Sequence, residues 1–178
     1  PLMDVNPMLH LVVPAANHDF VCKRLGCDPA WPIRIDASET LDVADLEFTA
    51  VPAAHEDVER DSEGHCRYLG YVVRCGQWTV YHSGDTVLYD GMEVTLRKFK
   101  IDLAILPING RKPERRVAGN LNGEEAAKLA KAIDARLVVP CHYDMFAFNT
   151  ESPDLFERTC KELDQPYKIL KAGERLTI

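Results

Sequence analysis

The most informative segment of this chain is Tyr81-His82-Ser83-Gly84-Asp85-Thr86. Residues 77–82 are rich in aromatic and β-branched side chains, which is typical of a β-strand. Ser83-Gly84 interrupts this pattern, because glycine adopts backbone conformations that other residues avoid. Asp85 is thereby placed in a loop at the carboxyl end of a strand, where α/β sheets bind their ligands. A single aspartate of this kind more often caps a turn, so its meaning depends on what lies beside it.

Two other predicted strands also end in a potential metal ligand. His55 follows residues 46–51, whose apolar side chains alternate, and His142 follows the apolar run 136–140. Histidine and carboxylate side chains suit zinc, manganese or iron, and strand-end loops bring distant residues together. One such histidine is more often structural, but three ligands at corresponding strand ends predict a metal site formed by His55, Asp85 and His142.

Other titratable residues near these strand ends are interpreted differently. His65 is the alternative to His55, since both border the acidic loop 56–64, but His55 directly follows a clean strand. His82 lies inside a predicted strand, which favours packing or support of a ligand over ligation. Cys141 is interpreted as a small buried thiol.

The remaining pattern predicts one α/β folding unit spanning residues 1–178, without repeats or linkers. Asn122, with Glu125 three residues later, predicts a capping box at the start of a helix. Ser152-Pro153 predicts the start of a second helix that continues to Leu163. Further helices are predicted at 17–25 and 93–99, and strands at 9–14, 32–35, 46–51, 66–74, 78–82, 101–106, 136–140, 167–170 and 175–178.

Composition excludes several classes of protein. The 178 residues are 46% hydrophobic and 28% charged, which is ordinary for a globular domain. Because 21 basic residues face 28 acidic ones, we expect no nucleic acid and no anionic membrane as partner. There is no apolar run of about 20 residues and no signal-peptide pattern. The six cysteines form no C-x-x-C pair, which favours a reducing, cytoplasmic location.

Three of these segments together resemble the later motifs of the metallo-β-lactamase superfamily. They are His55, the His82–Thr86 segment and Pro140-Cys141-His142. In that family a lone histidine, a metal-bridging aspartate and a last histidine follow one another in this order. The distal half of the chain is similar to the L-ascorbate-6-phosphate lactonase branch. The segments that carry this similarity are 107–111, 119–122 and 139–146.

The resemblance implies an α/β (α+β) fold of the αββα sandwich type, but with one large departure. The family's first motif, His-x-His-x-Asp-His, supplies most ligands of both metals and is absent here; His10 and His18 lack its spacing. We therefore expect the chain to be roughly the C-terminal half of the fold, with the other half and its sheet as a partner. A homo-oligomer is a further expectation.

The resemblance also implies roles for individual residues. Asp85 would bridge two divalent ions, zinc or manganese, that share an activated hydroxide, which makes Asp85 and His142 catalytic. His55 would complete the shell of one ion and His142 that of the other. Four residues are candidates for substrate binding; the alternatives are a turn-stabilising role for an asparagine, a surface position for the arginine and packing for the tyrosine. They are Asn109, Arg111, Asn120 and Tyr143.

The function implied is a metal-dependent hydrolase that opens a lactone or cleaves a phosphoester in a small, anionic, sugar-like substrate. The alternative is a non-catalytic binding or assembly subunit of the same fold, which the absent first motif favours. A nuclease is a third class, and the acidic charge balance disfavours it.

Overall fold

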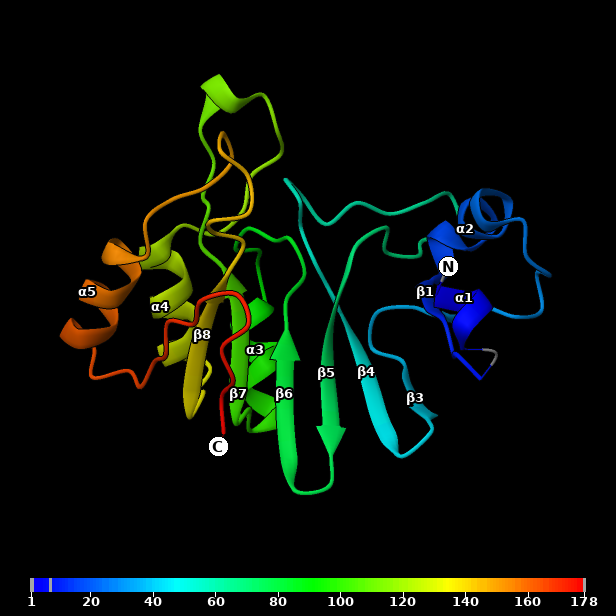
Figure 1. Ribbon diagram of the computed structural model, residues 1–178, viewed down its shortest axis with the longest axis horizontal. Coiled ribbons are helices and arrows are strands. Elements are labelled where there is room, and N and C mark those ends of the chain that lie inside the picture. Colours follow the sequence, from blue (N-terminus) through cyan, green and yellow to red (C-terminus); the bar gives the residue numbers. More distant parts are fainter. Residues whose placement is uncertain (1, 7, 178) are drawn as a thin grey trace.

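The computed structural model describes residues 2–6 and 8–177, which form one large sheet, one small sheet and five helices (Figure 1). The strands are β1 Val12–Pro14, β2 Ile33–Ile35, β3 Thr40–Val43, β4 Leu46–Pro52, β5 Leu69–Cys75, β6 Trp78–His82, β7 Leu103–Pro107 and β8 Leu137–Cys141. The helices are α1 Leu2–Val5, α2 His18–Leu25, α3 Met92–Leu96, α4 Gly123–Ala132 and α5 Asp154–Glu162.

The large sheet has the strand order β3-β4-β5-β6-β7-β8. Strands β3 to β6 pair antiparallel, and β6, β7 and β8 pair parallel through crossovers that contain α3 and α4. Since β4 and β6 both run opposite to β5, β4 points the same way as β6, β7 and β8. The carboxyl ends of these four strands therefore lie at one edge of the sheet, and their loops emerge together.

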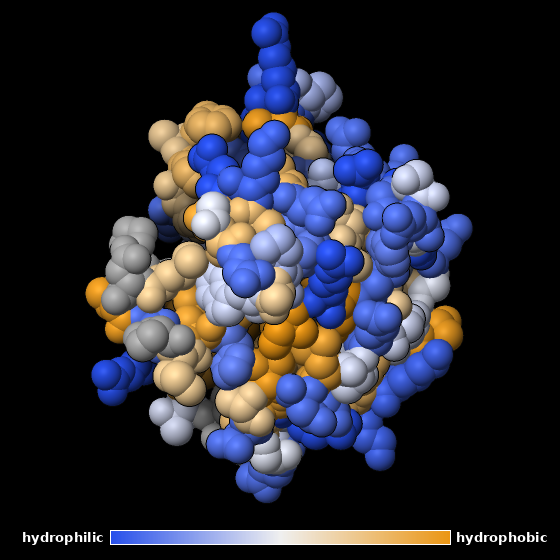
Figure 2. Space-filling view, turned by 90° about the vertical axis from the view of Figure 1, so that its right-hand side faces the viewer, coloured by the Kyte–Doolittle hydropathy of each residue, from blue (hydrophilic) through white to orange (hydrophobic). Residues whose placement is uncertain are grey.

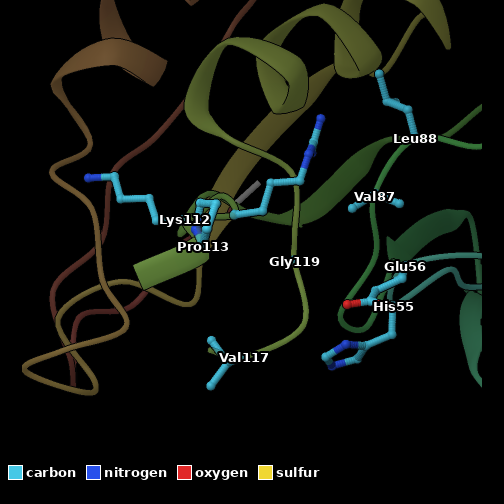
Figure 3. Close-up of a pocket in the computed structure, with 9 residues that line it drawn as sticks. His55, Glu56, Val87, Leu88, Lys112, Pro113, Val117 and Gly119 are labelled. Carbon is cyan, nitrogen blue, oxygen red and sulfur yellow. The ribbon is translucent and has the colours of Figure 1, made fainter. Parts of the chain in front are cut away.

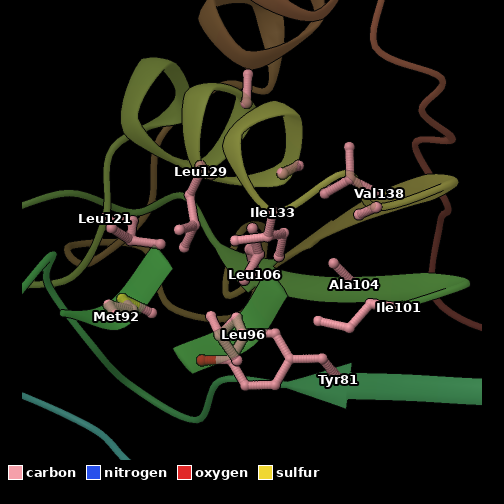
Figure 4. Close-up of a cluster of buried hydrophobic side chains, with 14 of the residues drawn as sticks. Tyr81, Met92, Leu96, Ile101, Ala104, Leu106, Leu121, Leu129, Ile133 and Val138 are labelled. Atoms are coloured by element: carbon pink, nitrogen blue, oxygen red, sulfur yellow. The ribbon is translucent and has the colours of Figure 1, made fainter. Parts of the chain in front are cut away.

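The main core lies between the sheet and the helices (Figure 4). Tyr81 of β6 and Leu106 of β7 pack there against Leu96 of α3 and against Leu129 of α4 and the following Ile133, all of them buried. Helix α4 begins with the predicted capping box, because Asn122 accepts a hydrogen bond from the Glu125 backbone while Glu125 accepts one from that of Asn122. The buried residues of α4, among them Ala126, Leu129 and Ala130, form the face that covers the sheet.

The opposite face of the sheet carries a second, smaller core. Ile35 of β2 and Val12 of β1 pack there with Ala50 of β4 and Tyr71 of β5. The parallel pair β1–β2 thus forms a second β layer over part of this face, which confirms the predicted α/β sandwich class. Five apolar residues on this face of β6 to β8 are only half-buried, whereas Val139 of β8 is buried. They are Trp78, Val80, Leu103, Ile105 and Leu137.

The end of the molecule at which β3 lies is mainly hydrophilic, with an apolar hollow in its lower half (Figure 2). Among the described residues, no helix combines the length and the apolar composition that crossing a bilayer requires.

Several predicted elements are corrected by the structure. Strand β5 begins at Leu69 rather than at Cys66, and β1 is confined to Val12–Pro14. Helix α3 ends at Leu96 and continues only as a 3₁₀ turn, Arg97–Phe99. The helix predicted from residue 17 begins at His18, and the side-chain amide of Asn17 donates to the backbone oxygen of Arg67 rather than capping the helix.

The two C-terminal strands that the pattern predicts are not formed within the described residues. Segment 167–170 makes a single bridge between Tyr167 and Val138. Residues 171–177 contain a turn instead, in which the Glu174 carboxylate accepts the Lys171 backbone hydrogen bond. The last residue of the predicted strand 175–178 lies outside the described residues.

Strand β3 was not predicted at all. It pairs with β4 through a two-residue turn, Ala44-Asp45, because Val43 lies opposite Leu46. Ala44 has φ 52°, a conformation that such turns usually give to glycine or asparagine. The turn therefore lacked the residue types by which a hairpin is recognised.

Candidate metal centre

His55, Asp85 and His142 come together at the edge where β4, β6 and β8 end. The Nε2 atom of His55 lies 3.6 Å from Oδ2 of Asp85. The Nε2 atom of His142 lies 3.5 Å from the same oxygen. The carboxylate is thus flanked by two imidazoles that are 30 and 57 residues away in sequence. This is the arrangement that the strand-end pattern predicted.

The turn that carries Asp85 is tightly built. Gly84 has φ 63°, and its backbone N–H donates to Nδ1 of His82 at 3.0 Å. The buried Ser83 hydroxyl donates to the Gly84 oxygen at 2.7 Å. Strand β5 approaches the turn so closely that a Cβ on Gly70 would lie 2.8 Å from the Ser83 oxygen. A side chain larger than hydrogen at position 70 would therefore displace the turn.

Thr86 joins the loop of Asp85 to the loop of His55. It is fully buried; its hydroxyl accepts the Ala54 backbone N–H at 3.0 Å and donates to the Val87 oxygen at 2.8 Å. The Val87 N–H donates in turn to the Ala54 oxygen at 2.7 Å. Sequence reasoning assigned Thr86 no role, although it stands in the motif. Its threonine hydroxyl fixes the separation between His55 and Asp85.

His142 occupies an unusual backbone position. Its φ is 58°, a left-handed conformation that costs non-glycine residues energy and that clusters at functional sites. Its Nδ1 atom is buried and has no hydrogen-bond partner in the described part of the chain. The neighbouring Cys141 is half-buried rather than fully buried as predicted, and desolvation raises the pKa of its thiol to about 12, which keeps it protonated.

The structure distinguishes His55 from His65, the two candidates for the metal-ligating histidine that precedes Asp85 in the sequence. His65 Nδ1 lies 3.2 Å from Asp61 Oδ2 and 3.7 Å from Glu63 Oε2, inside its own acidic loop. His55 instead faces Asp85, with its ring centroid 5.5 Å from that of Tyr68. The geometry therefore favours His55 as the partner of Asp85.

Of the four predicted substrate residues, Arg111 and Tyr143 form side-chain hydrogen bonds within the chain, whereas Asn109 and Asn120 each leave a buried side-chain oxygen unpaired within the described ranges. Arg111 forms two hydrogen bonds with Glu125, at 2.6 and 3.0 Å. The Tyr143 hydroxyl donates to the backbone oxygen of Leu170. Asn109 and Asn120 are buried, and the side-chain oxygen of each has no partner among the residues described.

A cleft of about 410 Å³ opens beside His55 (Figure 3). Its volume falls in the range of small-molecule sites. The lining is mainly apolar, and His55 and Val117 lie on either side of it. Arg111 is the one predicted substrate residue in its lining. The other lining residues are Glu56, Val87, Leu88, Lys112, Pro113 and Gly119.

A salt-bridge network formed by Lys112, Arg115 and Glu151, called the clasp below, joins the two loops above the sheet, residues 107–121 and 141–153. The nearly buried Arg115 side chain donates to the backbone oxygens of Asn109 and Thr150, the latter at 2.8 Å. Glu151 accepts from both Arg115 and Lys112. Figure 1 shows the two loops rising side by side. The walls of the cleft and the His142 loop are therefore held as one unit.

Removing the charge of Glu151 should loosen this clasp. In a Glu151→Gln variant we expect trypsin to cleave after Arg115 and Arg116 several times faster than in the wild type, because charge-assisted hydrogen bonds are about twice as strong as neutral ones. Glu162→Gln, in an exposed helix position, is the matched control and should leave the cleavage rate unchanged. An unchanged rate in Glu151→Gln would show that the loops do not depend on the clasp.

The clasp should also respond to acid. The hydrogen bond from Lys112 holds the pKa of Glu151 below its ordinary value of 4.5. A lowered carboxylate pKa means that the stabilisation is complete above pH 4.5 and is lost as the pH falls through the lowered pKa. Amide resonances of the two loops, followed by NMR from pH 7 downward, should therefore shift with a midpoint below 4.5 in the wild type and not in Glu151→Gln.

The described residues alone do not enclose a metal ion. No group of three or more His, Cys, Asp or Glu side chains within 2–6 and 8–177 is arranged to hold one. The Nε2 atoms of both histidines lie near the same Asp85 oxygen. An ion beside either histidine would therefore receive two ligands from this part of the chain, namely that histidine and Asp85. A zinc site with a catalytic role has about three protein ligands and a water.

The fold and the site together define a class of protein, in which a helix-covered mixed sheet presents a His–Asp–His set at one edge. The family model described as "Beta-lactamase superfamily domain" matches residues 11–143, and the chain belongs to this family. The predicted resemblance to the metallo-β-lactamase superfamily is confirmed. Its lactonase branch stays a prediction.

Curated relatives share this family. A UPF0173 metal-dependent hydrolase of Methanoculleus marisnigri is 32% identical over 84% of this chain and 65% of its own length. A second, from Methanopyrus kandleri, is 34% identical over 76% of this chain and 58% of its own length. The alignments with these relatives thus span about three-fifths of their length.

A solved structure supports the fold. The structure of Igni18, a metallo hydrolase from Ignicoccus hospitalis, superposes with a TM-score of 0.73 over 97% of this chain and 70% of that protein, at 19% identity.

Proposed function

We propose that this chain forms part of a metal-dependent hydrolase and supplies the bridging carboxylate and one histidine to each of two divalent ions. The observation that carries the proposal is the position of Asp85 Oδ2, at 3.5 and 3.6 Å from two imidazole nitrogens. The names of the two curated relatives, both metal-dependent hydrolases, support the same activity.

The spacing of the donor atoms fits a metal. With metal–ligand distances of about 2.0–2.2 Å, two ligands of a tetrahedral zinc ion lie about 3.3–3.6 Å apart. Both His–Asp separations agree with this range. Because the described part of the chain has no three side chains arranged to hold one ion together, two ions sharing Asp85 fit better than one ion held by all three residues. Zinc and manganese both suit this donor set.

The remaining ligands would come from polypeptide outside the described residues. The half-buried apolar residues on the open face of β6 to β8 support this, since a second sheet would bury them. We propose the other half of the sandwich as that partner.

The chain's own residues would hold the reacting groups in place. When bound, the two ions would lower the pKa of a water molecule and polarise the bond that it attacks. Asp85 would fix the distance between the ions, and the buried Thr86 hydroxyl would fix the His55 loop relative to Asp85. The apolar side of the cleft would exclude bulk water, which strengthens electrostatic interactions there.

Of the two reactions that the resemblance implies, the cleft favours opening of a lactone or ester over cleavage of a phosphoester. Recognition of a phosphate uses free cations, above all arginine. Arg111 and Lys112, which line the cleft, are paired with Glu125 and Glu151. An anionic, sugar-like substrate stays a prediction and would require Arg111 to leave Glu125.

Substituting each of the two competing histidines tests the metal-site assignment. In the full-length protein, His55→Ala should lower the metal content measured by elemental analysis and abolish hydrolysis of lactones. His65→Ala, the matched control, should keep both, because His65 pairs with Asp61. Loss of metal in His65→Ala and not in His55→Ala would overturn the assignment.

The second candidate function is a non-catalytic binding or assembly subunit of this fold. The observation that favours it is that no described group of three ligands encloses an ion. Full-length protein that is folded and still binds no zinc or manganese at micromolar concentrations would establish this alternative.

A further inference from the structure

We propose that the substrate of this centre carries an apolar group, and that the loop after His142 binds this group through Met145, Phe146 and Phe148. These three residues are called the aromatic rim below. The chemical class is a lactone or carboxylic ester with an alkyl or aryl substituent. This inference rests on the proposed function and names its substrate class.

The first observation is the exposure of the aromatic rim. Met145, Phe146 and Phe148 expose 66%, 48% and 63% of their surface within four residues of chain. Single exposed apolar residues are ordinary, but a contiguous group of large ones marks a binding site. The energetic reason is that removing large apolar side chains from water is favourable in proportion to the apolar area buried.

The second observation is where the aromatic rim lies. The ring of Phe146 is 6.2 Å from that of His142, and the ring of Phe148 is 6.3 Å from that of Phe146. Both separations are those of interacting aromatic pairs. The rim therefore leads outward from the histidine that would hold an ion. A group attached close to a scissile bond at Asp85 would reach it.

The third observation is the chemistry of the cleft on the His55 side. Val87, Leu88 and Val117 contribute apolar surface there, and Leu88 and Val117 are partly exposed. The two cations of the lining are neutralised by glutamates, and Glu56 adds a negative charge. A phosphate or carboxylate substituent would find no free cation in this lining, whereas an alkyl or aryl group would find apolar surface.

The fourth observation is that the aromatic rim is held in place. The loop that carries it is clasped to residues 107–121 by Arg115 and Glu151, and the Asp144 backbone N–H donates to the Thr150 hydroxyl at 2.8 Å. A preorganised loop binds a ligand without first being ordered. A hollow of about 560 Å³, lined among others by His142 and Met145, has the size of a small-molecule site, which favours a substrate over a partner protein.

The reaction can be written for a simple lactone. Water adds to the carbonyl carbon, the ring C–O bond breaks, and the alkoxide takes up the proton that the water releases, giving a hydroxy acid. No oxidant or further reactant is needed. The apolar substituent takes no part in these steps and contributes only binding energy.

The experiment compares three lactones with the full-length, metal-loaded protein. δ-Decalactone carries an alkyl chain, δ-valerolactone carries none, and 6-phosphogluconolactone is anionic and sugar-like. We expect kcat/KM to be highest for δ-decalactone. Phe146→Ala combined with Phe148→Ala should lower the ratio of kcat/KM for δ-decalactone to that for δ-valerolactone about tenfold or more, as expected for loss of buried aromatic contacts. Phe20→Ala removes an exposed phenylalanine of α2 and is the matched control, which should leave the ratio unchanged.

A binding measurement keeps this inference separate from the proposed reaction. By calorimetry, hexanoate should bind the metal-loaded protein more tightly than acetate, and the double phenylalanine variant should remove the difference. If no lactone is hydrolysed but hexanoate is still preferred, the reaction fails and the apolar site stands. A preference for 6-phosphogluconolactone, or an unchanged ratio and an unchanged hexanoate preference in the double variant, would overturn the inference.

Discussion

Asp85→Asn should release bound metal and abolish hydrolysis while the protein stays folded. The change replaces a charged carboxylate, flanked at 3.5 and 3.6 Å by His142 and His55, with a neutral amide of the same shape. Loss of a group that merely supports a ligand costs about 10–100-fold in metal affinity, so loss of a bridging ligand should cost more. Elemental analysis of dialysed protein and lactone hydrolysis measure the two effects, and circular dichroism reports the fold.

Asp90→Asn is the matched control for this experiment. Asp90 is an exposed aspartate in the segment that follows the Asp85 turn. Its substitution should leave metal content and hydrolysis at wild-type levels. Equal metal content in wild-type protein and Asp85→Asn would refute the bridging role, whatever happens to activity.

Phe156→Ala should lower the free energy of unfolding by about 3–5 kcal/mol, the range for deleting a buried aromatic ring. Phe156 is fully buried and meets the ring of Tyr167 edge-on at 6.0 Å. It also marks where α5 presses on α4, because a Cβ on Gly123 would lie 2.7 Å from the Phe156 backbone nitrogen. The surrounding backbone is too close-packed to fill the cavity that alanine would leave. Urea unfolding of both proteins gives the difference.

Phe20→Ala removes the same ring from an exposed position of α2 and serves as the control. Its unfolding free energy should stay within about 0.5 kcal/mol of the wild-type value. A loss of less than about 1 kcal/mol in Phe156→Ala would mean that α5 can repack, and that the contact between α4 and α5 is looser than the structure shows.

The convergence of the three site residues could be predicted because it depends on local signals. Each strand pattern ends at a residue that can be recognised, and Gly84 marks the turn before Asp85. Because β4, β6 and β8 run in the same direction, their carboxyl ends lie at one edge of the sheet, which brings the three residues together. The capping box at Asn122 is also local, and it formed as predicted.

The partners of the substrate candidates could not be predicted, because they depend on long-range contacts between side chains. Arg111 meets a glutamate 14 residues later, and the Tyr143 hydroxyl meets a backbone oxygen 27 residues later. Arg115 reaches Glu151 across 36 residues. The local periodicity of the sequence does not indicate which lysine or arginine will form a salt bridge with a given glutamate. Loops whose ends are fixed by the sheet still have many conformations of similar energy.

Because β4, β6, β7 and β8 run in the same direction, the molecule has two parts that tolerate substitution differently: the helix-covered sheet and the loops at one edge of that sheet. The crossover helices α3 and α4 pack on one face of the sheet, while the segments that contain His55, Asp85 and His142 lie at one edge of it. Lengthening or exchanging residues 144–148 alters no strand register and removes none of the residues that pack in the helix-facing core. Replacing this loop with one from another protein should thus change the substrate preference without changing the scaffold. The loops at this edge of the sheet are therefore the natural place to redesign the protein.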